Sequence, residues 1–418
     1  MKNLARASIV ALALALAAGM SISSVSAALR PISQHPVMGY NTWYQFRTGM
    51  TQQTILKQAK YLVSTGLAAT GYDYVNLDDG WMARERARDG ALTWDVAKFP
   101  KGIPWLVARL HAMGLKFGIY EAIGKRTCQH FPGSWGHYAQ DAKTFARWGV
   151  DFIKIDECGG LPAKTTASTL TSDFRSYGAD LRAADPEVVY SEELPIYSMG
   201  QPSFLSTVRA SASFANMWRV APDEKYTQPA SYTILSHLAD DLDLNSFAGP
   251  CRWNDLDMLV PGKQTAMPFD WGLQAEESQL SVWAEEASPL LISTNLPTLT
   301  PAELTALKNP LMITIDESGS QAQKAVTSGH IEAVIKGADG GLAVLLVNLG
   351  TGTANGHFTL AQLGITTARA SGDNVWTGKS TTFSGVSVRL AANQTALLVL
   401  KNCGAAECRV RVIHKRNR

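Results

Sequence analysis

The stretch YVNLDDGW, residues 74–81, combines a buried-strand pattern with two adjacent carboxylates at its end. Its first four positions are mostly apolar, whereas Asp78 and Asp79 are charged and repel each other. Successive side chains of a strand point to opposite faces, so one regular strand cannot turn both carboxylates to the same side. We therefore expect the strand to end at Leu77 and to deliver both carboxylates to the rim of a sheet.

Similar apolar runs alternate with helix-like segments from about residue 36 to residue 300. Ile55, Ala59 and Leu62, for example, lie on one stripe of a predicted helix. About eight strands alternating with helices predict a parallel α/β fold, and the count favours a closed (β/α)8 TIM barrel. An open doubly wound sheet is the alternative, although no glycine-rich dinucleotide fingerprint follows the first strand. The expected strands are Val37–Tyr40, Tyr74–Leu77, Lys116–Tyr120, Phe152–Ile155, Val188–Ser191, Phe214–Arg219, Met258–Val260 and Leu290–Ser293.

The pattern changes after about residue 308, where short strands separated by Gly, Asn and Ser turns replace the helices. Segments such as GLAVLLVNLG and VSVRLAANQTALLVL predict an antiparallel β-sandwich domain. We therefore expect a catalytic barrel over residues 28–308, a helix-free β-sandwich over 309–402 and a basic tail over 403–418.

The first 27 residues have the pattern of a secretory signal peptide. Lys2 and Arg6 precede an apolar run from about Ile9 to Met20, and small residues precede a cleavage position near Ala27. The run is short for a membrane span, although a retained anchor is the alternative. We expect an exported protein, secreted or periplasmic, with no membrane segment after cleavage.

The composition argues against several classes of function. With 418 residues, 46% hydrophobic and 18% charged, the chain is globular and long enough for one large and one small domain. Its formal net charge of +2 gives no large basic field, so nucleic-acid binding is not expected. No Cys-x-x-Cys pair or histidine cluster appears, so we expect no metal site and no cofactor. Its five cysteines can form disulfides in an exported protein, with at least one unpaired or paired between chains.

Several polar groups fall at the carboxyl ends of predicted strands, where barrel enzymes carry their catalytic residues. Lys154 and Asp156 are two residues apart in FIKIDEC and face the same side of one strand. Burying a charge is unfavourable unless the charge is paired. The lysine would lower the pKa of the aspartate and keep it ionised, which suits a nucleophile; a structural ion pair is the alternative. The other strand-end groups are Glu192, Glu193, Arg219, Asp223, Asp255 and Asp257.

Asp78 and Asp79 admit three interpretations. Their oxygens could bind a divalent metal, accept hydrogen bonds from neighbouring sugar hydroxyls, or belong to a solvated turn. Flanking Trp43, Trp81 and Tyr120 favour the sugar, because aromatic faces pack against the apolar face of a pyranose ring.

Several long blocks resemble glycoside hydrolase family 27, which contains α-galactosidases and α-N-acetylgalactosaminidases. MGYNTW resembles the family's opening Met-Gly-Trp-Asn-Ser-Trp, and YVNLDDGW resembles its Asp-Asp-Cys-Trp strand end. GLKFGIYEAIGKRTC, FPGSWGHYAQDAKTFARWGVDFIKIDEC, RWNDLDML and SVWAEEASPLLIS extend the resemblance over the barrel, and VWTGK extends it into the β-domain. The resemblance, closest to the α-galactosidases, implies a TIM barrel with a β-sandwich and hydrolysis of galactose-containing carbohydrates.

The family mechanism is a retaining double displacement. By resemblance, Asp156 attacks the anomeric carbon while Asp223 protonates the leaving oxygen, and water then resolves the covalent intermediate. The general rule places the two carboxylates about 5–5.5 Å apart. A general acid needs a raised pKa, so we expect Arg219 to serve the sugar and Asp156 rather than Asp223. The positions that match sugar-lining residues of the family are Trp43, Asp78, Asp79, Tyr120, Lys154, Glu193, Ile196, Tyr197, Arg219 and Asp257.

Substrate preference in the family depends on the groups at C2, C4 and C6 of the sugar. By resemblance, Asp78 and Asp79 accept from the 4- and 6-hydroxyls, and the segment YSEELPIY faces C2. Glu193 and Ile196 are bulky, as in galactosidases, whereas α-N-acetylgalactosaminidases have small residues there. We therefore expect exo-hydrolysis of terminal α-D-galactosyl residues of oligosaccharides, polysaccharides or glycoconjugates. The alternatives are a β-L-arabinopyranosidase, an α-glucan hydrolase and, in another class, a catalytically inactive carbohydrate-binding protein.

The resemblance also predicts how the cysteines pair. Cys128 and Cys158 are expected to form a bridge in the barrel, and Cys403 and Cys408 could close a small loop in the tail. Cys251 then remains as a buried, inert thiol.

Two further bridges of the family are missing. Gly80 follows the aspartate pair where many members have a cysteine, and the partner segment QFRTGM contains none. Glu192 likewise replaces a cysteine, and its partner segment FANMWR contains none. Each bridge has therefore lost both of its cysteines.

Overall fold

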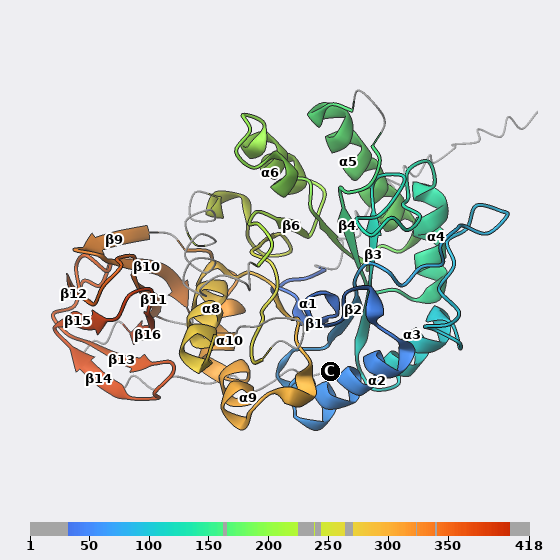
Figure 1. Ribbon diagram of the computed structural model, residues 1–418. Helices are drawn as coiled ribbons and strands as arrows, with labels where there is room; N and C mark the ends of the chain where they lie inside the picture. The colour runs from blue at the N-terminus through green and yellow to red at the C-terminus, as the bar shows by residue number, and fades with distance from the viewer. Residues whose placement is uncertain are drawn as a thin grey trace, which may run out of the picture. The chain divides into compact units, whose positions relative to one another are not determined.

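The computed structural model describes residues 32–161, 165–224, 238, 244–263, 271–322, 324–338 and 341–401 (Figure 1). The expected signal peptide and basic tail, with Cys403 and Cys408, lie outside the described residues. Within the described ranges, no helix combines the length and the apolar character that crossing a membrane requires.

Eight parallel strands form one sheet in the order β7-β6-β5-β4-β3-β2-β1-β8. Leu259, just after β7, accepts from the Ser293 N–H and donates its own N–H to Leu291 O, both at 2.8 Å. This bridge to β8 brings the two ends of the sheet together and confirms the barrel class expected from the alternating pattern. The strands are β1 Met38–Asn41, β2 Tyr74–Leu77, β3 Lys116–Ala122, β4 Phe152–Asp156, β5 Val189–Glu192, β6 Met217–Arg219, β7 Trp253–Asp255 and β8 Leu290–Ile292.

The expected seventh strand is wrong. The observed strand is Trp253–Asp255, whereas Met258–Val260 makes only the single bridge at Leu259. Asp257 lies between the two segments with φ 83°, which interrupts an extended backbone. The sequence pattern favoured Met258–Val260 because it is more apolar than Trp253–Asp255, and nothing in the sequence indicated the positive φ at Asp257.

Helices connect the strands and cover the sheet. In α2, Ile55, Ala59 and Leu62 are buried, which confirms the predicted stripe. Thr51 begins this helix with a reciprocal capping box formed with Thr54. The helices are α1 Trp43–Phe46, α2 Gln52–Ser64, α3 Ile103–His111, α4 Tyr138–Trp148, α5 Ala167–Ala184, α6 Phe204–Ser211, α8 Leu273–Glu286, α9 Pro301–Leu307 and α10 Pro310–Asp316.

The expectation of a helix-free region beyond residue 308 is wrong, because α10 lies there. The Asn309 side chain accepts from the N–H groups of Leu311 and Met312, and Pro310 occupies the first turn. An N-cap asparagine followed by proline is a helix-start signal that the change in composition obscured.

The C-terminal strands form two antiparallel sheets, ordered β14-β13-β16-β11-β10-β9 and β12-β15. Val344 and Leu346 of the larger sheet share one buried cluster with Phe358 and Val386 of the smaller sheet. This shared core confirms the predicted sandwich. The strands are β9 Lys324–Ser328, β10 Ile331–Ala338, β11 Gly341–Asn348, β12 Ala354–Thr359, β13 Ala370–Asn374, β14 Ser380–Phe383, β15 Gly385–Leu390 and β16 Thr395–Lys401.

Candidate active site

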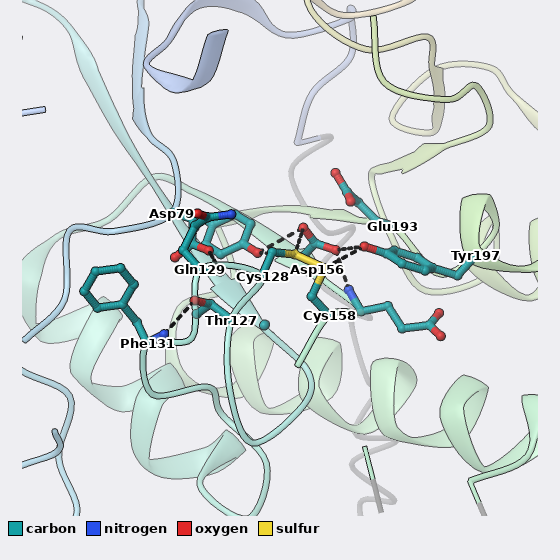
Figure 2. The surroundings of a disulfide bond; sticks show 12 residues. Asp79, Thr127, Cys128, Gln129, Phe131, Asp156, Cys158, Glu193 and Tyr197 are labelled. Atoms are coloured by element: carbon teal, nitrogen blue, oxygen red, sulfur yellow. Dashed lines mark hydrogen bonds between the residues drawn. A yellow bond between two sulfur atoms is a disulfide. The ribbon is translucent and has the colours of Figure 1, made fainter. Parts of the chain in front are cut away.

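The carboxyl end of β4 places Asp156 among polar side chains that come from neighbouring strand ends. Figure 2 shows Asp79, Glu193 and Tyr197 gathered around it, beside a disulfide. In the sheet, Tyr120 of β3 pairs in register with Lys154 of β4, so both side chains reach the same edge. Parallel strands whose carboxyl ends meet at one edge assemble residues that lie far apart in sequence.

Asp156 is a buried carboxylate that is held in a fixed orientation. Only 6% of the surface of Asp156 is exposed to solvent. Oδ1 accepts from the Tyr197 hydroxyl at 2.5 Å and from the Glu157 N–H at 2.7 Å, and Oδ2 accepts from the Tyr120 hydroxyl at 2.9 Å (Figure 2). Hydrogen bonds to both oxygens restrict rotation of the carboxylate, and a fixed orientation is a property that a carboxylate nucleophile needs.

Cys128 and Cys158 form the disulfide expected from the family resemblance, with a Cα–Cα distance of 4.9 Å. The bond joins the loop after β3 to the loop after β4, and Cys128 Sγ lies 3.2 Å from Asp156 Oδ2. Within the described part of the chain, these two sulfurs and the Asp156 carboxylate form the one group of possible metal ligands within 4.8 Å of one another. The disulfide leaves no thiolate for a metal, so this donor set does not suit one.

Asp78 and Asp79 follow β2 directly, as expected, and both carboxylates accept hydrogen bonds from groups of the protein. Asp78 Oδ2 accepts from Asn41 Nδ2 at 3.0 Å and from Lys154 Nζ at 3.3 Å. Asp79 Oδ2 accepts from the Gln129 N–H at 2.8 Å. Asp79 Oδ1, however, is buried with no hydrogen-bond partner among the described groups, so one acceptor remains available to a ligand.

The environment of Asp79 favours its protonated form. Burial raises the pKa of this carboxyl from 3.8 to about 7, even though hydrogen bonds from Thr127 and Gln129 act in the opposite direction. The negative charges of Asp78 and Asp156 act in the same direction as burial and are part of this shift. A hydroxyl donor from a ligand would stabilise the carboxylate and reverse part of this shift.

Lys154 pairs with Asp78 and Glu193 rather than with its strand neighbour Asp156. The ammonium lies 3.3 Å from Asp78 Oδ2 and 3.1 Å from Glu193 Oε1, and it also stands 5.4 Å from the centre of the Tyr120 ring. The expected direct Lys154–Asp156 ion pair is therefore replaced by a bridge between two strand ends. The long lysine side chain extends beyond β4, so its ammonium meets carboxylates at the ends of other strands.

Arg219 holds Asp223, contrary to expectation. Its Nη2 lies 3.0 Å from Asp223 Oδ1, and its Nη1 lies 3.2 Å from Glu193 Oε1 and 3.0 Å from an oxygen of Asp257. Burial raises the pKa of Asp223, but Arg219 and then Lys154 outweigh that effect and lower it overall. The Asp223 side chain is nevertheless 73% exposed, so this carboxylate faces the open side of the site.

Asp257 lies behind Arg219 and orients the loop that carries Asp223. Its Oδ2 accepts from the Tyr44 hydroxyl and from the Glu224 N–H at 2.7 Å. Burial raises the pKa of Asp257 to about 6, and Arg219 opposes the shift. Asp257 therefore acts as a positioning residue, because it holds Arg219 and the backbone next to Asp223.

The aromatic residues divide into two groups. Tyr120 and Tyr197 lie at the site, where both hydroxyls donate to Asp156, and Ile196 begins the short 3-10 turn that carries Tyr197. Trp43 begins α1 and is half-exposed. Trp81 does not take part, because it is fully buried and packs edge-on against Phe145 and Trp148.

Gly80 has a conformational reason to lack a side chain. Its φ is 99°, and an added Cβ would come 2.8 Å from Thr48 Cβ. The positive φ and the close approach of Thr48 both favour glycine, so any other residue at position 80 would require a local rearrangement of the backbone.

Asn41 and Tyr44 are site residues that the sequence analysis missed. Asn41 ends β1 and binds Asp78, so the strand-end rule that selected the other residues would also have found it. Tyr44 lies within a short helix and carries no comparable signal. Glu192 ends β5 as expected; it is fully buried, and burial raises its pKa to about 8. One expectation needs correction, because Cys251 is free but only half-buried.

Comparison with known proteins gives consistent matches. A family profile described as Alpha galactosidase A matches residues 36–318, and one described as Alpha galactosidase C-terminal beta sandwich domain matches residues 329–400. A Probable alpha-galactosidase A of Aspergillus fumigatus is 34% identical over 76% of this chain and 61% of its own length, so this chain spans less than two thirds of that relative. An Alpha-N-acetylgalactosaminidase of Gallus gallus is 32% identical over 73% of this chain and 76% of its own length. The crystal structure of alpha-galactosidase I from Mortierella vinacea superposes with a TM-score of 0.78 at 25% identity, covering 88% of this chain and 97% of that one.

Proposed function

Because this chain belongs to the alpha galactosidase A family of glycoside hydrolases, we propose that it is a retaining exo-α-galactosidase. Its substrates would be oligosaccharides, polysaccharides or glycoconjugates that end in α-D-galactosyl residues. The observation that carries the proposal is the buried, doubly hydrogen-bonded carboxylate of Asp156 at the end of β4. The signal-like N-terminus supports export of the enzyme.

In this proposal, Asp156 is the nucleophile. Tyr120 and Tyr197 hold its two oxygens, so one lone pair can be aimed at the anomeric carbon without a search over rotamers. Attack expels the leaving oxygen and forms a covalent galactosyl-enzyme ester, which water then cleaves.

Asp223 is the proposed acid and base. In the free enzyme its ion pair with Arg219 favours the carboxylate, which suits the second step, in which Asp223 takes a proton from water. For the first step, the bound sugar must weaken this ion pair. A 2-hydroxyl that engages Arg219, together with exclusion of water by the ring, would raise the pKa of Asp223 in the complex.

The groups beside the nucleophile support galactose as the sugar. Asp79 offers an unpartnered buried oxygen to a hydroxyl at C4 or C6, with Asp78 beside it. Glu193 is pinned by Lys154 and Arg219, so it cannot withdraw to admit an acetamido group at C2. These contacts favour galactose over N-acetylgalactosamine.

The test is hydrolysis of four 4-nitrophenyl glycosides: the α-galactoside, the α-N-acetylgalactosaminide, the β-L-arabinopyranoside and the α-glucoside. We expect the α-galactoside to give the highest kcat/KM, with loss of activity in Asp156→Ala and in Asp223→Ala. Asp89→Asn, at an exposed position, is the control. NMR spectra recorded early in the reaction should show α-galactose as the first product. Release of β-galactose first, or full activity in Asp156→Ala, would refute the mechanism.

A further inference from the structure

Arg47 ends helix α1 with a backbone conformation that favours glycine. Its φ is 49° and its ψ is −136°, close to the first central position of a type II′ turn, where glycine is the usual residue. Its N–H donates to Trp43 O, so the conformation is part of the turn that closes the helix. A bulky residue in such a conformation is unfavourable, and outliers of this kind concentrate at functional sites.

The Arg47 guanidinium lies over two aromatic rings at the site. Its carbon is 4.8 Å from the centre of the Trp43 ring and 6.0 Å from the centre of the Tyr44 ring, both within the range of cation–π attraction. The Tyr44 hydroxyl in turn accepts from the Glu224 N–H at 2.8 Å. Tyr44 therefore connects Arg47 to the residue directly after Asp223.

Arg47 and Arg219 approach Asp223 from different environments. Arg219 is buried, whereas Arg47 is half-exposed. The Asp223 side chain is also open to solvent. Both cations lower the pKa of Asp223, Arg219 more strongly. Among the described residues, the charged and titratable groups that interact electrostatically with Asp223 include Arg47, Lys154, Arg219, Glu193 and Asp257, with Tyr44 and Tyr197.

We propose that Arg47 binds the leaving group of the substrate and selects galactosides whose aglycone carries a negative charge. The inference rests on the proposed function, in which Asp223 protonates the leaving oxygen. A general acid lies within hydrogen-bond reach of that oxygen. Arg47 contacts the Trp43 and Tyr44 rings, and the Tyr44 hydroxyl accepts from the residue after Asp223, so this half-exposed cation lies on the same rim as the proposed acid. A guanidinium carries five N–H donors in a fork that matches a carboxylate, and it can accept such a ligand while keeping other contacts.

This arrangement links aglycone binding to acid catalysis. An anionic aglycone that pairs with Arg47 neutralises part of the positive charge near Asp223. The pKa of Asp223 then rises toward its ordinary value, and its protonated form persists to higher pH. A substrate with an anionic aglycone should therefore show its basic-limb inflection in kcat at higher pH than a neutral substrate does.

The test compares 3-carboxyphenyl with 3-carbamoylphenyl α-galactoside, which differ in charge but little in shape. We expect the ratio of their kcat/KM values to be about threefold to fivefold higher for the wild type than for Arg47→Gln, the range of a partly exposed ion pair. Arg47→Lys, which keeps the charge, should retain part of the ratio. For the wild type, the preference should shrink between about 50 mM and 500 mM salt, because salt screens exposed charges.

The outcomes separate this inference from the proposed function. If the wild type hydrolyses both galactosides with the same ratio as Arg47→Gln, the inference is wrong while the function stands. The salt series uses only the wild type, so it remains informative if a variant does not fold. A kcat/KM ratio that is the same at about 50 mM and about 500 mM salt overturns the inference. If the wild type hydrolyses neither galactoside, the proposed function fails and the inference falls with it.

Discussion

Replacing Asp79 by asparagine should stabilise the fold at neutral pH and remove most of the activity. The substitution keeps the shape of the side chain and the acceptor for the Gln129 N–H, and it removes a buried negative charge. Burial raises the pKa of Asp79 from 3.8 to about 7. A shift of about three units corresponds to about 4 kcal/mol of lost stability once the group is ionised, which is an upper bound.

The sign of the effect follows from proton binding. Between pH 4 and pH 7 the folded protein retains a proton on Asp79 that the unfolded chain has released. The contribution of this group to the free energy of unfolding therefore decreases as pH rises through that window and is lowest above pH 7. Asparagine does not titrate, so the stability advantage of Asp79→Asn should be small at pH 4.5 and largest at pH 8.

Urea unfolding at pH 4.5, 6 and 8 measures this difference, with Asp89→Asn at an exposed position as the control. Activity should change in the opposite direction. Loss of a charge-assisted hydrogen bond from a sugar hydroxyl lowers kcat/KM about 10- to 150-fold. A stability difference between Asp79→Asn and the wild type that stays constant from pH 4.5 to pH 8 would refute the argument from burial.

Three further substitutions test other contacts. Tyr197→Phe removes the 2.5 Å hydrogen bond to Asp156 and should lower kcat for 4-nitrophenyl α-galactoside about tenfold; an unchanged kcat would exclude an orienting role. Glu193→Ser should raise kcat/KM for the α-N-acetylgalactosaminide relative to the α-galactoside, and a constant ratio would show that this side chain does not block C2. Gly80→Ala places a Cβ 2.8 Å from Thr48 at a φ of 99° and should lower the free energy of unfolding by about 1–3 kcal/mol in urea titrations; wild-type stability would mean that the loop adapts.

The strand ends could be predicted because their signal is local. An apolar run followed by a charge, as at Leu77–Asp78 and Ile155–Asp156, needs only the period of a strand and the rule that barrel sites lie at carboxyl ends. The same local rule failed for β7, because the observed strand, Trp-Asn-Asp, is less apolar than the neighbouring run Met258–Val260, and Asp257 with its positive φ separates the two.

The partners of the charged side chains could not be predicted in this way. Lys154 bonds to Asp78 after β2 and to Glu193 after the neighbouring strand β5, and Arg219 bonds to Asp223. Each partner lies on a different strand or loop, and the choice among several carboxylates within reach depends on distances of a few tenths of an ångström.

The amino-acid sequence alone determined the alternating barrel, the C-terminal β-sandwich, the family resemblance and the residue types available for catalysis, because these depend on periodicity and on ordered blocks along the chain. Only the tertiary structure decided which oxygen of the Asp78–Asp79 pair is buried without a hydrogen-bond partner, which aspartate an arginine holds, and that Arg47 occupies a glycine-like backbone over Trp43. The physical reason is that pKa values, ion pairs and burial are set by groups that meet in space, and the spacing of residues along a strand carries no record of the neighbours that other strands supply.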